Sequence, residues 1–494
     1  MMYRFRSKVI VGLLLLALTI MPLGSAVSIA YAAVALASPV GDAVSTFAYT
    51  QNMHPMGFSA RENTASPFTA NSDFAFWGNY AYHGNYDGFR IIDISAPANP
   101  VEVLDYRDCA GNQGDVIVWG NILVRSWNSP APAGATCDGE PVLPGVFPGG
   151  WEGLHVFDIS DPTDPDLVAS IETECGSHTA TGVPDLANDR LLIYNSPSSG
   201  ACPGIDIVEV PLSDPASASY LRFEPAGRSC HDTGVILGGV NLAACAGGNG
   251  FTVWSLDAAS GGSLEDPMQL YSRSITGVTI GHSASFTWDG SVLIFDHEPG
   301  GGGQAQCQAT SSITNRSLFF FEASSGTLLG TFVHPRPQTN LENCTWHNYN
   351  IVPSDKRYVL IAGNYQSGIS IVDLTDPANA VEIANADPAP LSPTSLVLGG
   401  DWSTYWYDGR IYESDITRGL IAWDLSDNVV AGAMKLGHLN PQTQETSFPF
   451  KGTAFGKNKA AADQQGFVVF GESAPGDVSG GEGGGEDFGG DGGD

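Results

Sequence analysis

One short phrase recurs seven times along this chain and constrains the fold more than any other feature. Each copy ends a strand-like run and reads apolar-apolar-Asp, then Ser or Thr, then Asp-Pro or a near relative. The clearest copies lie at Gly88–Pro100, Gly153–Pro165 and Gly368–Ala380. Such a repeat predicts one supersecondary unit reused around a closed ring.

Aligned on this phrase, the chain divides into seven units of roughly fifty residues, each with four strand-like runs. We therefore predict an all-β fold, a seven-bladed β-propeller with four-stranded antiparallel blades. Both terminal blades look complete, which leaves open whether the ring closes by mixing strands from both ends. The predicted blades span 72–106, 115–171, 177–223, 230–273, 281–333, 346–386 and 401–437.

The phrases Ile91–Ser95, Val156–Ser160 and Ile371–Thr375 resemble those of a known family, the bacterial secreted proteins built from LVIVD repeats. The resemblance covers most of 72–437 and implies a β-propeller. The copies in the fourth and fifth blades depart from the pattern. This family is defined by its repeat, so the resemblance implies no catalytic residue.

The two ends of the chain differ from the repeats. Basic residues precede the apolar run Val9–Leu23, which predicts a signal peptide over 1–37, with an uncleaved anchor helix as the alternative. An N-terminal extension (38–71) precedes the propeller, and a C-terminal extension (438–473) follows it. Within the latter, Gly466–Phe470 could form an extra strand. A Gly/Asp/Glu tail over 474–494 is expected to be disordered.

We therefore expect a secreted or extracytoplasmic protein, at the cell surface or in the periplasm, with no membrane span after signal cleavage. The formal net charge of −32 repels phosphate backbones, which argues against nucleic-acid binding. An unknown extracellular ligand or protein is the expected partner, and cations suit the surface better than anions.

Four predicted blades begin with a histidine at the equivalent position. Inner strands surround the central channel, so these imidazoles should converge at its mouth. Neutral imidazole ligates transition metals such as Zn, Cu or Fe. For each histidine the alternative is a structural role, in which it staples neighbouring blades. The four are His178, His231, His282 and His347.

A second tier of candidates stands where second strands end. His297 and Glu298 are the candidate additional metal ligands there, and His83 and Asp415 occupy equivalent places.

Blade seven starts with Asp401 and Trp402, which are candidate binding residues at the mouth. The ring of Trp402 could stack on a sugar or a cation. Arg418 is a further candidate binding residue, with pairing to a carboxylate as its alternative.

Eight cysteines in an exported chain predict disulfides. Half lie at blade junctions and half follow second strands, so both sets fall on the face that carries the histidines. A Cys/His metal cluster is the alternative, although no Cys-x-x-Cys spacing occurs. The predicted pairs are Cys109–Cys137, Cys175–Cys202, Cys230–Cys245 and Cys307–Cys344.

No serine-hydrolase elbow, P-loop or His-Glu-x-x-His motif occurs, and the catalytic residues, if there are any, stay unknown. The leading hypothesis is an exported propeller scaffold that presents one loop-rich face to a ligand or protein. The alternative is a metal-dependent enzyme with its ion held by histidines at the channel mouth. A surface-layer or adhesion component is a third.

Overall fold

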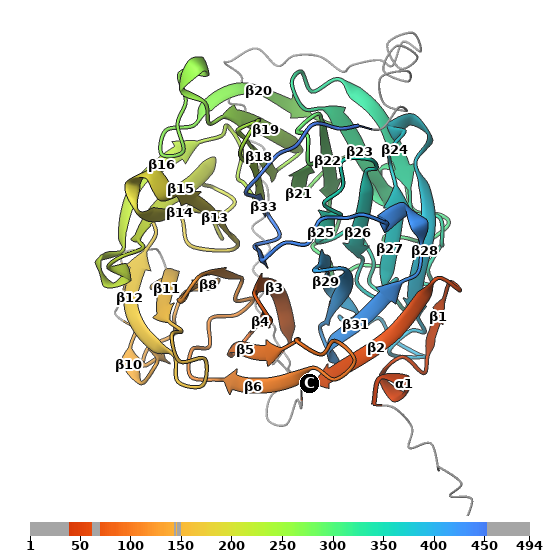
Figure 1. The fold of residues 1–494 in the computed structure, drawn as a ribbon, viewed down its shortest axis with the longest axis horizontal. Helices are drawn as coiled ribbons and strands as arrows, with labels where there is room; N and C mark the ends of the chain where they lie inside the picture. Colours follow the sequence, from red (N-terminus) through yellow and green to blue (C-terminus); the bar gives the residue numbers. More distant parts are fainter. Residues whose placement is uncertain (1–38, 62–69, 143–144, 146–149, 452–494) are drawn as a thin grey trace, which may run out of the picture. The chain divides into compact units, whose positions relative to one another are not determined.

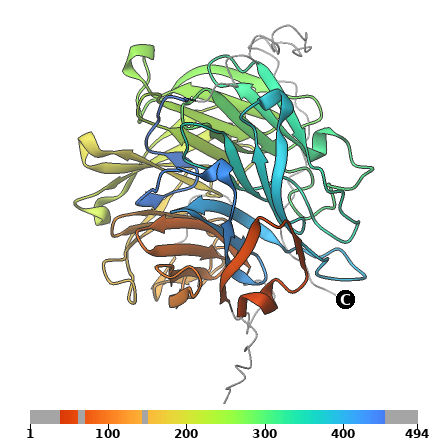
Figure 2. The same cartoon turned by 45° about the vertical axis from the view of Figure 1, so that its right-hand side comes forward.

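A computed structural model describes residues 39–61, 70–142, 145 and 150–451 of the chain. The predicted signal peptide, the predicted strand Gly466–Phe470 and the predicted acidic tail lie outside these residues. The described part is almost entirely β-structure, and the only α-helix in it is the short α1 (Pro39–Ala43). Seven sheets radiate from a central channel (Figures 1 and 2), which confirms the predicted seven-bladed β-propeller.

In the first six blades, four antiparallel strands follow one another in chain order from the channel outward. The first blade holds β3 (Asn71–Trp77), β4 (Tyr80–Asn85), β5 (Gly88–Asp93) and β6 (Val101–Tyr106); the second holds β7 (Val116–Trp119), β8 (Ile122–Trp127), β11 (Gly153–Asp158) and β12 (Asp166–Glu172); the third holds β13 (Ala180–Asp185), β14 (Arg190–Asn195), β15 (Gly204–Pro211) and β16 (Ser219–Pro225).

The fourth blade holds β17 (Asp232–Ile236), β18 (Leu242–Gly247), β19 (Gly250–Ser255) and β20 (Met268–Ser274); the fifth holds β21 (Gly281–Phe286), β22 (Val292–His297), β23 (Ser317–Glu322) and β24 (Leu328–Val333); the sixth holds β25 (Tyr349–Ile351), β26 (Val359–Gly363), β27 (Ile369–Asp373) and β28 (Val381–Pro388); the seventh starts with β29 (Asp401–Tyr407), β30 (Arg410–Asp415) and β31 (Gly419–Leu425).

The fourth strand of the seventh blade comes from the N-terminal extension. β2 (Met53–Ala60) pairs antiparallel with β31, from Met53 opposite Leu425 to Ala60 opposite Gly419. The chain after β31 forms no outer strand of its own in the described residues, so the seventh blade is not complete in sequence, contrary to expectation. The ring therefore closes by mixing strands from the two ends of the propeller.

The recurring phrase has a local structural cause. In three copies the aspartate Oδ1 accepts a hydrogen bond from the backbone N–H two residues later, with Asp93–Ser95 at 2.8 Å, Asp158–Ser160 at 2.8 Å and Asp373–Thr375 at 3.0 Å. This turn ends the third strand of the blade without any distant partner. The phrase is therefore scaffold.

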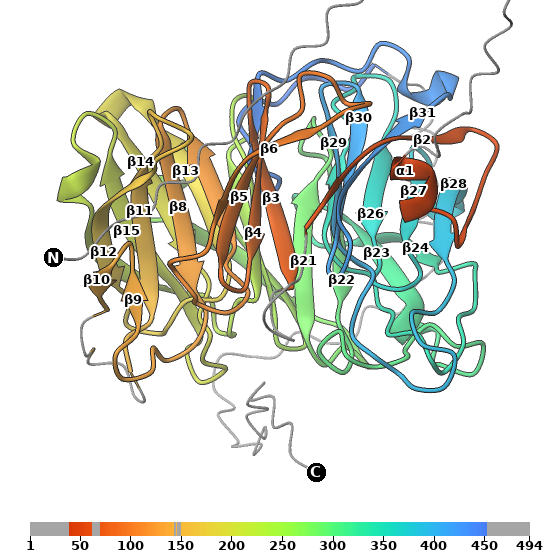
Figure 3. The ribbon, with the colours of Figure 1, turned by 90° about the horizontal axis from the view of Figure 1, so that it is seen from below.

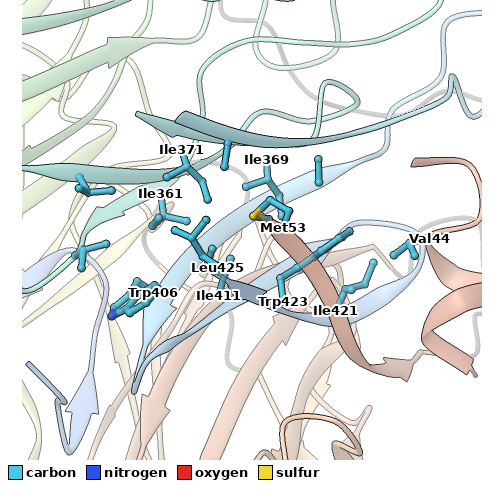
Figure 4. Packing of buried hydrophobic residues seen from close by; sticks show 14 of the residues in the cluster. Val44, Met53, Ile361, Ile369, Ile371, Trp406, Ile411, Ile421, Trp423 and Leu425 are labelled. Atoms are coloured by element: carbon cyan, nitrogen blue, oxygen red, sulfur yellow. The ribbon is translucent and has the colours of Figure 1, made fainter. Parts of the chain in front are cut away.

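The faces of neighbouring blades bury the apolar side chains of the strands. Both faces of a blade are covered, so successive strand residues are buried although they point in opposite directions. Ile91 packs toward the second blade, whereas Ile92 packs among the tyrosines of the seventh. Figure 4 shows the same arrangement between the sixth and seventh blades, where Met53 from β2 packs with Ile371 and Trp423.

The segment after the seventh blade, residues 438–451, crosses one end of the channel (Figures 1 and 3). Its β32 (His438–Leu439) pairs with β3, and its β33 (Thr443–Gln444) pairs in parallel with β17. Asn440 hydrogen-bonds both backbone groups of Val118, each at 2.9 Å. We call residues 438–451 the strap. Its Ser447 and Phe448 contact Val240 and Trp288 in turns between first and second strands, while Gln442 reaches into the channel and donates to Asp73 at 2.9 Å.

Candidate metal centre

Four histidines from four consecutive blades form a continuous row. Neighbouring ring centroids are 4.3 Å apart for His178–His231, 4.2 Å for His231–His282 and 4.3 Å for His282–His347. Each residue stands at or just before an inner strand. Backbone bonds to the second strand of the same blade fix two of them: the His178 N–H donates to Ser196, and that of His231 donates to Ala246.

In the two end members of the row, His178 and His347, hydrogen bonds define which ring nitrogen is available to a metal ion. Nδ1 of His347 donates to the backbone oxygen of Trp402, and Nδ1 of His178 lies 2.6 Å from Oδ1 of Asn128. A histidine that donates through Nδ1 keeps a lone pair on Nε2, and metal-binding histidines commonly donate their other ring nitrogen to a protein acceptor in this way. Both contacts also join neighbouring blades, as the structural alternative expects.

Two buried carboxylates complete the set. Asp232 Oδ1 lies 3.6 Å from His231 Nδ1, and Asp232 Oδ2 lies 4.0 Å from His282 Nδ1. Glu298 Oε1 lies 3.5 Å from His347 Nε2. Two triads result, and within each the three ligand atoms lie within 4.8 Å of one another. The triads share His282: one is His231, Asp232 and His282, and the other is His282, Glu298 and His347.

Burial keeps most of these imidazoles neutral. It lowers the pKa of His178 and of His347 to about 3, and it lowers the pKa of His282 well below its ordinary value. His231 differs: burial acts in the same direction, but the adjacent Asp232 carboxylate outweighs it and raises the pKa of His231. Neutral imidazole is the form that ligates metals, so burial favours the ligand form of three members of the row, whereas Asp232 favours the protonated form of His231.

Aromatic side chains surround the end of the row. The ring of Tyr365 lies 4.3 Å from that of His347, and its hydroxyl donates to Glu298 Oε1. The predicted residue Trp402 contacts the row through its ring, 5.3 Å from His347, and through its carbonyl. The sequence analysis missed Tyr365 and Asp232 as parts of the site. Asp232 directly follows His231, and Tyr365 follows the second strand of its blade, as Glu298 does.

Of the second-tier pair, only Glu298 lies with the row. His297 is its neighbour at the end of β22, and adjacent strand residues point to opposite faces. Its Nε2 instead bonds the backbone oxygen of Thr314 at 2.8 Å. His83 is also directed elsewhere, with Nε2 2.7 Å from the Ser414 hydroxyl.

The remaining predicted binding residues belong to the seventh blade. Asp401 bonds the backbone of Tyr365 in both directions, while its carboxyl group is buried with Glu413 and Asp415. Arg418 pairs with Asp415, and its guanidinium lies 5.1 Å from the ring of Phe47. In the described part of the chain, neither the Asp401 nor the Arg418 side chain forms a hydrogen bond or ion pair with a histidine of the row.

The structure joins all eight cysteines in four disulfides, in the same pairs as the sequence analysis proposes. Two histidines lie beside such bridges: His155 near Cys109–Cys137 and His334 near Cys307–Cys344. A bridged sulfur is not the thiolate that a metal needs, so these two groups do not support the Cys/His cluster.

No helix among residues 39–61, 70–142 and 150–451 has the length and apolar character that crossing a membrane requires. No curated protein matches the chain. Among solved structures, the computationally designed Ika8 protein is similar over 75% of this chain and 99% of its own, at 9% identity and a TM-score of 0.43.

The LVIVD repeat model matches residues 71–108 and 149–173. The first match covers the four strands of the first blade, and the second covers the two outer strands of the second blade. The matched segments contain the Asp93 and Asp158 turns. The chain is therefore a seven-bladed β-propeller that carries LVIVD repeats.

Proposed function

We propose that this protein binds a transition metal ion at the mouth of its central channel. The proposed ligands are His178, His231, His282 and His347, with Glu298 and Asp232 as the carboxylates. One observation carries the proposal: two His/carboxylate triads share His282 in a single row. Zn, Cu and Fe all accept imidazole with carboxylate.

Of the two leading hypotheses from the sequence, the row supports the histidine-held metal over the scaffold that only presents loops. A scaffold that only displays loops does not need imidazoles from four blades to meet at one place. Burial of uncharged imidazoles beside carboxylates is costly unless a cation or proton compensates the charge. Asp232 favours a proton on His231, and such a proton would compensate the charge. A metal ion would replace it.

We also propose that the chain is exported and that the loop-rich face around the row meets an extracellular ligand or protein. Four disulfides support an oxidising compartment. The site is open to that face through His231, whose side chain is 21% exposed, whereas His282 is 2% exposed.

Metal analysis of protein purified without chelator tests the proposal. After chelation and reloading with Zn²⁺, Cu²⁺ or Co²⁺, we expect near-stoichiometric uptake and a higher Tm, about 2.7 kcal/mol of stabilisation at a hundredfold excess over Kd. His282→Ala should abolish both effects, because it breaks both triads. His54→Ala is the matched control, since the side chain of His54 is exposed and hydrogen-bonds Ser426, far along the chain from the row.

The outcomes separate the two roles of the row. If wild-type protein takes up no metal and its Tm does not respond, the metal proposal is wrong. If His282→Ala then still lowers the Tm relative to His54→Ala, the row is a structural staple between blades.

A further inference from the structure

Tyr365 is a polar neighbour of Glu298 whose role the metal proposal leaves unexplained. It is buried, 3% exposed, and lies in the loop that follows the second strand of the sixth blade. Its hydroxyl donates to Glu298 Oε1, the same oxygen that lies 3.5 Å from His347 Nε2. The phenol therefore restricts the rotation of the carboxylate that faces the row.

The backbone at Tyr365 is unusual for a bulky residue. Its φ is 53°, in the left-handed region. This conformation costs a residue with a Cβ roughly 1–2 kcal/mol, and glycine or asparagine would occupy it more easily. The backbone hydrogen bonds of this loop require only the left-handed conformation at position 365 and not a tyrosine side chain. A tyrosine that bears this cost is typical of a functional position.

Contacts from the seventh blade hold Tyr365 in that conformation. Its N–H donates to the Asp401 oxygen at 3.0 Å, and its own oxygen accepts from the Asp401 N–H at 2.9 Å. Gly400 lies against it so closely that a Cβ there would be 2.2 Å from the Tyr365 carbonyl. Two blades thus fix the ring direction.

A glycine-rich loop after β22 in the fifth blade, residues 299–306, covers the Tyr365–Glu298 pair. At Gly302, with φ of 70°, a Cβ would lie 2.2 Å from the Tyr365 hydroxyl oxygen and 2.5 Å from Glu298 Oε1. Asn343 anchors this loop by donating to the Gly302 oxygen at 2.9 Å. A hydrogen bond shielded in this way is stronger than one in water, so it can set the carboxylate orientation.

We infer that Tyr365 is a positioning residue that orients Glu298 as a carboxylate ligand of the metal. The inference rests on the proposed metal site and adds a residue to it. Tyr365 acts through Glu298 and does not itself bind the ion. Loss of a residue that holds a metal ligand by a hydrogen bond typically weakens metal affinity by about 10–100-fold.

A double-mutant cycle with Co²⁺ tests this role, since Co²⁺ reports its ligand field by visible absorption. Tyr365→Phe keeps the ring and removes the hydroxyl. We expect it to retain near-stoichiometric Co²⁺, to weaken the affinity by about 10–100-fold and to change the absorption spectrum. Glu298→Gln should weaken binding as well. The double variant should bind no more weakly than Glu298→Gln alone, because both changes remove one interaction.

Tyr194→Phe is the matched control. Tyr194 is also buried, in β14 of the third blade. Its hydroxyl donates to the backbone oxygen of Leu264, which lies between β19 and β20 of the fourth blade. It should lower stability about as much as Tyr365→Phe and leave Co²⁺ affinity and spectrum unchanged.

The failures of the two proposals differ. If wild-type protein binds no Co²⁺, the metal site itself is refuted. If wild-type protein binds but Tyr365→Phe shows the wild-type affinity and spectrum, only the role of Tyr365 is refuted. Additive losses in the double variant would also refute it, since Tyr365 would then act independently of Glu298.

Discussion

The Nε2 atoms of His178 and His231 lie 2.8 Å apart, so one proton must lie between them. His178 donates through Nδ1 to Asn128, which leaves its Nε2 as the acceptor. The proton therefore belongs to Nε2 of His231. A metal that takes both Nε2 atoms as ligands must displace this proton.

Metal affinity should therefore depend on pH through His231. Its pKa is raised by Asp232 in the folded protein, and the metal needs the neutral ring. We predict that affinity rises with pH until His231 is deprotonated and that binding releases a proton. Calorimetry in two buffers of different ionisation enthalpy measures this release. Asp232→Asn also removes a proposed ligand, so affinity should be weaker throughout; its pH dependence should shift to lower pH, because the carboxylate that favours protonated His231 is gone.

Closure of the ring through β2 should be sensitive to one glycine. A Cβ at Gly57 would lie 2.1 Å from the Pro97 oxygen, which belongs to the loop between β5 and β6. We predict that Gly57→Ala lowers the free energy of unfolding by about 1–3 kcal/mol, as overpacking does. Gly437→Ala is the control, because no atom lies within 4 Å of its Cβ position. Equal stabilities of the two variants in urea would contradict the prediction.

The strap should stabilise the ring mainly through Asn440. Its amide satisfies both the N–H and the oxygen of Val118, which are buried in the second blade. Asn440→Ala leaves two backbone groups unpaired, at a cost of about 1–3 kcal/mol each. We expect a lower urea midpoint with an unchanged slope. Asn440→Asp retains the acceptor alone and should be intermediate or worse, since it adds a buried charge.

Asp206 should make stability fall as pH rises. Burial raises its pKa to about 7, above that of an unfolded aspartate, so the folded state holds a proton that the unfolded state has lost. Between about pH 4 and 7 the unfolding free energy should drop by up to about 1.4 kcal/mol per pH unit from this group. Asp206→Asn should remove this slope, as urea titrations at pH 5, 6 and 7 would show. Parallel profiles for both proteins would refute the prediction.

Sequence patterns predicted those parts of the molecule that local chemistry determines. The Asp93 and Ser95 turn forms within three residues, so the phrase marks each blade wherever it occurs. The turn at Gly120, with φ of 58°, is equally local. Once the blades are aligned, the starts of their inner strands must meet, and this places His178 beside His231.

Other features depend on distant partners and left no comparable signal. β2 pairs with β31 across almost the whole propeller, and nothing near Met53 indicates this partner. The choice between His297 and Glu298 depends on the residue at which β22 leaves its sheet, and a shift of one residue reverses the result. Tyr365 enters the site through a left-handed backbone held by Asp401, which belongs to another blade.

The pairing of β2 with β31 has a consequence for biogenesis. A ribosome completes β2 before any blade exists, and its partner only after six blades have been made. Until then β2 keeps an unpaired edge, and the ring stays open at one seam. The large sequence separation between β2 and β31 makes their pairing slow compared with folding within a blade. The row of histidines lies on the third to sixth blades, so all the strands that carry it are made before the strand that closes the ring.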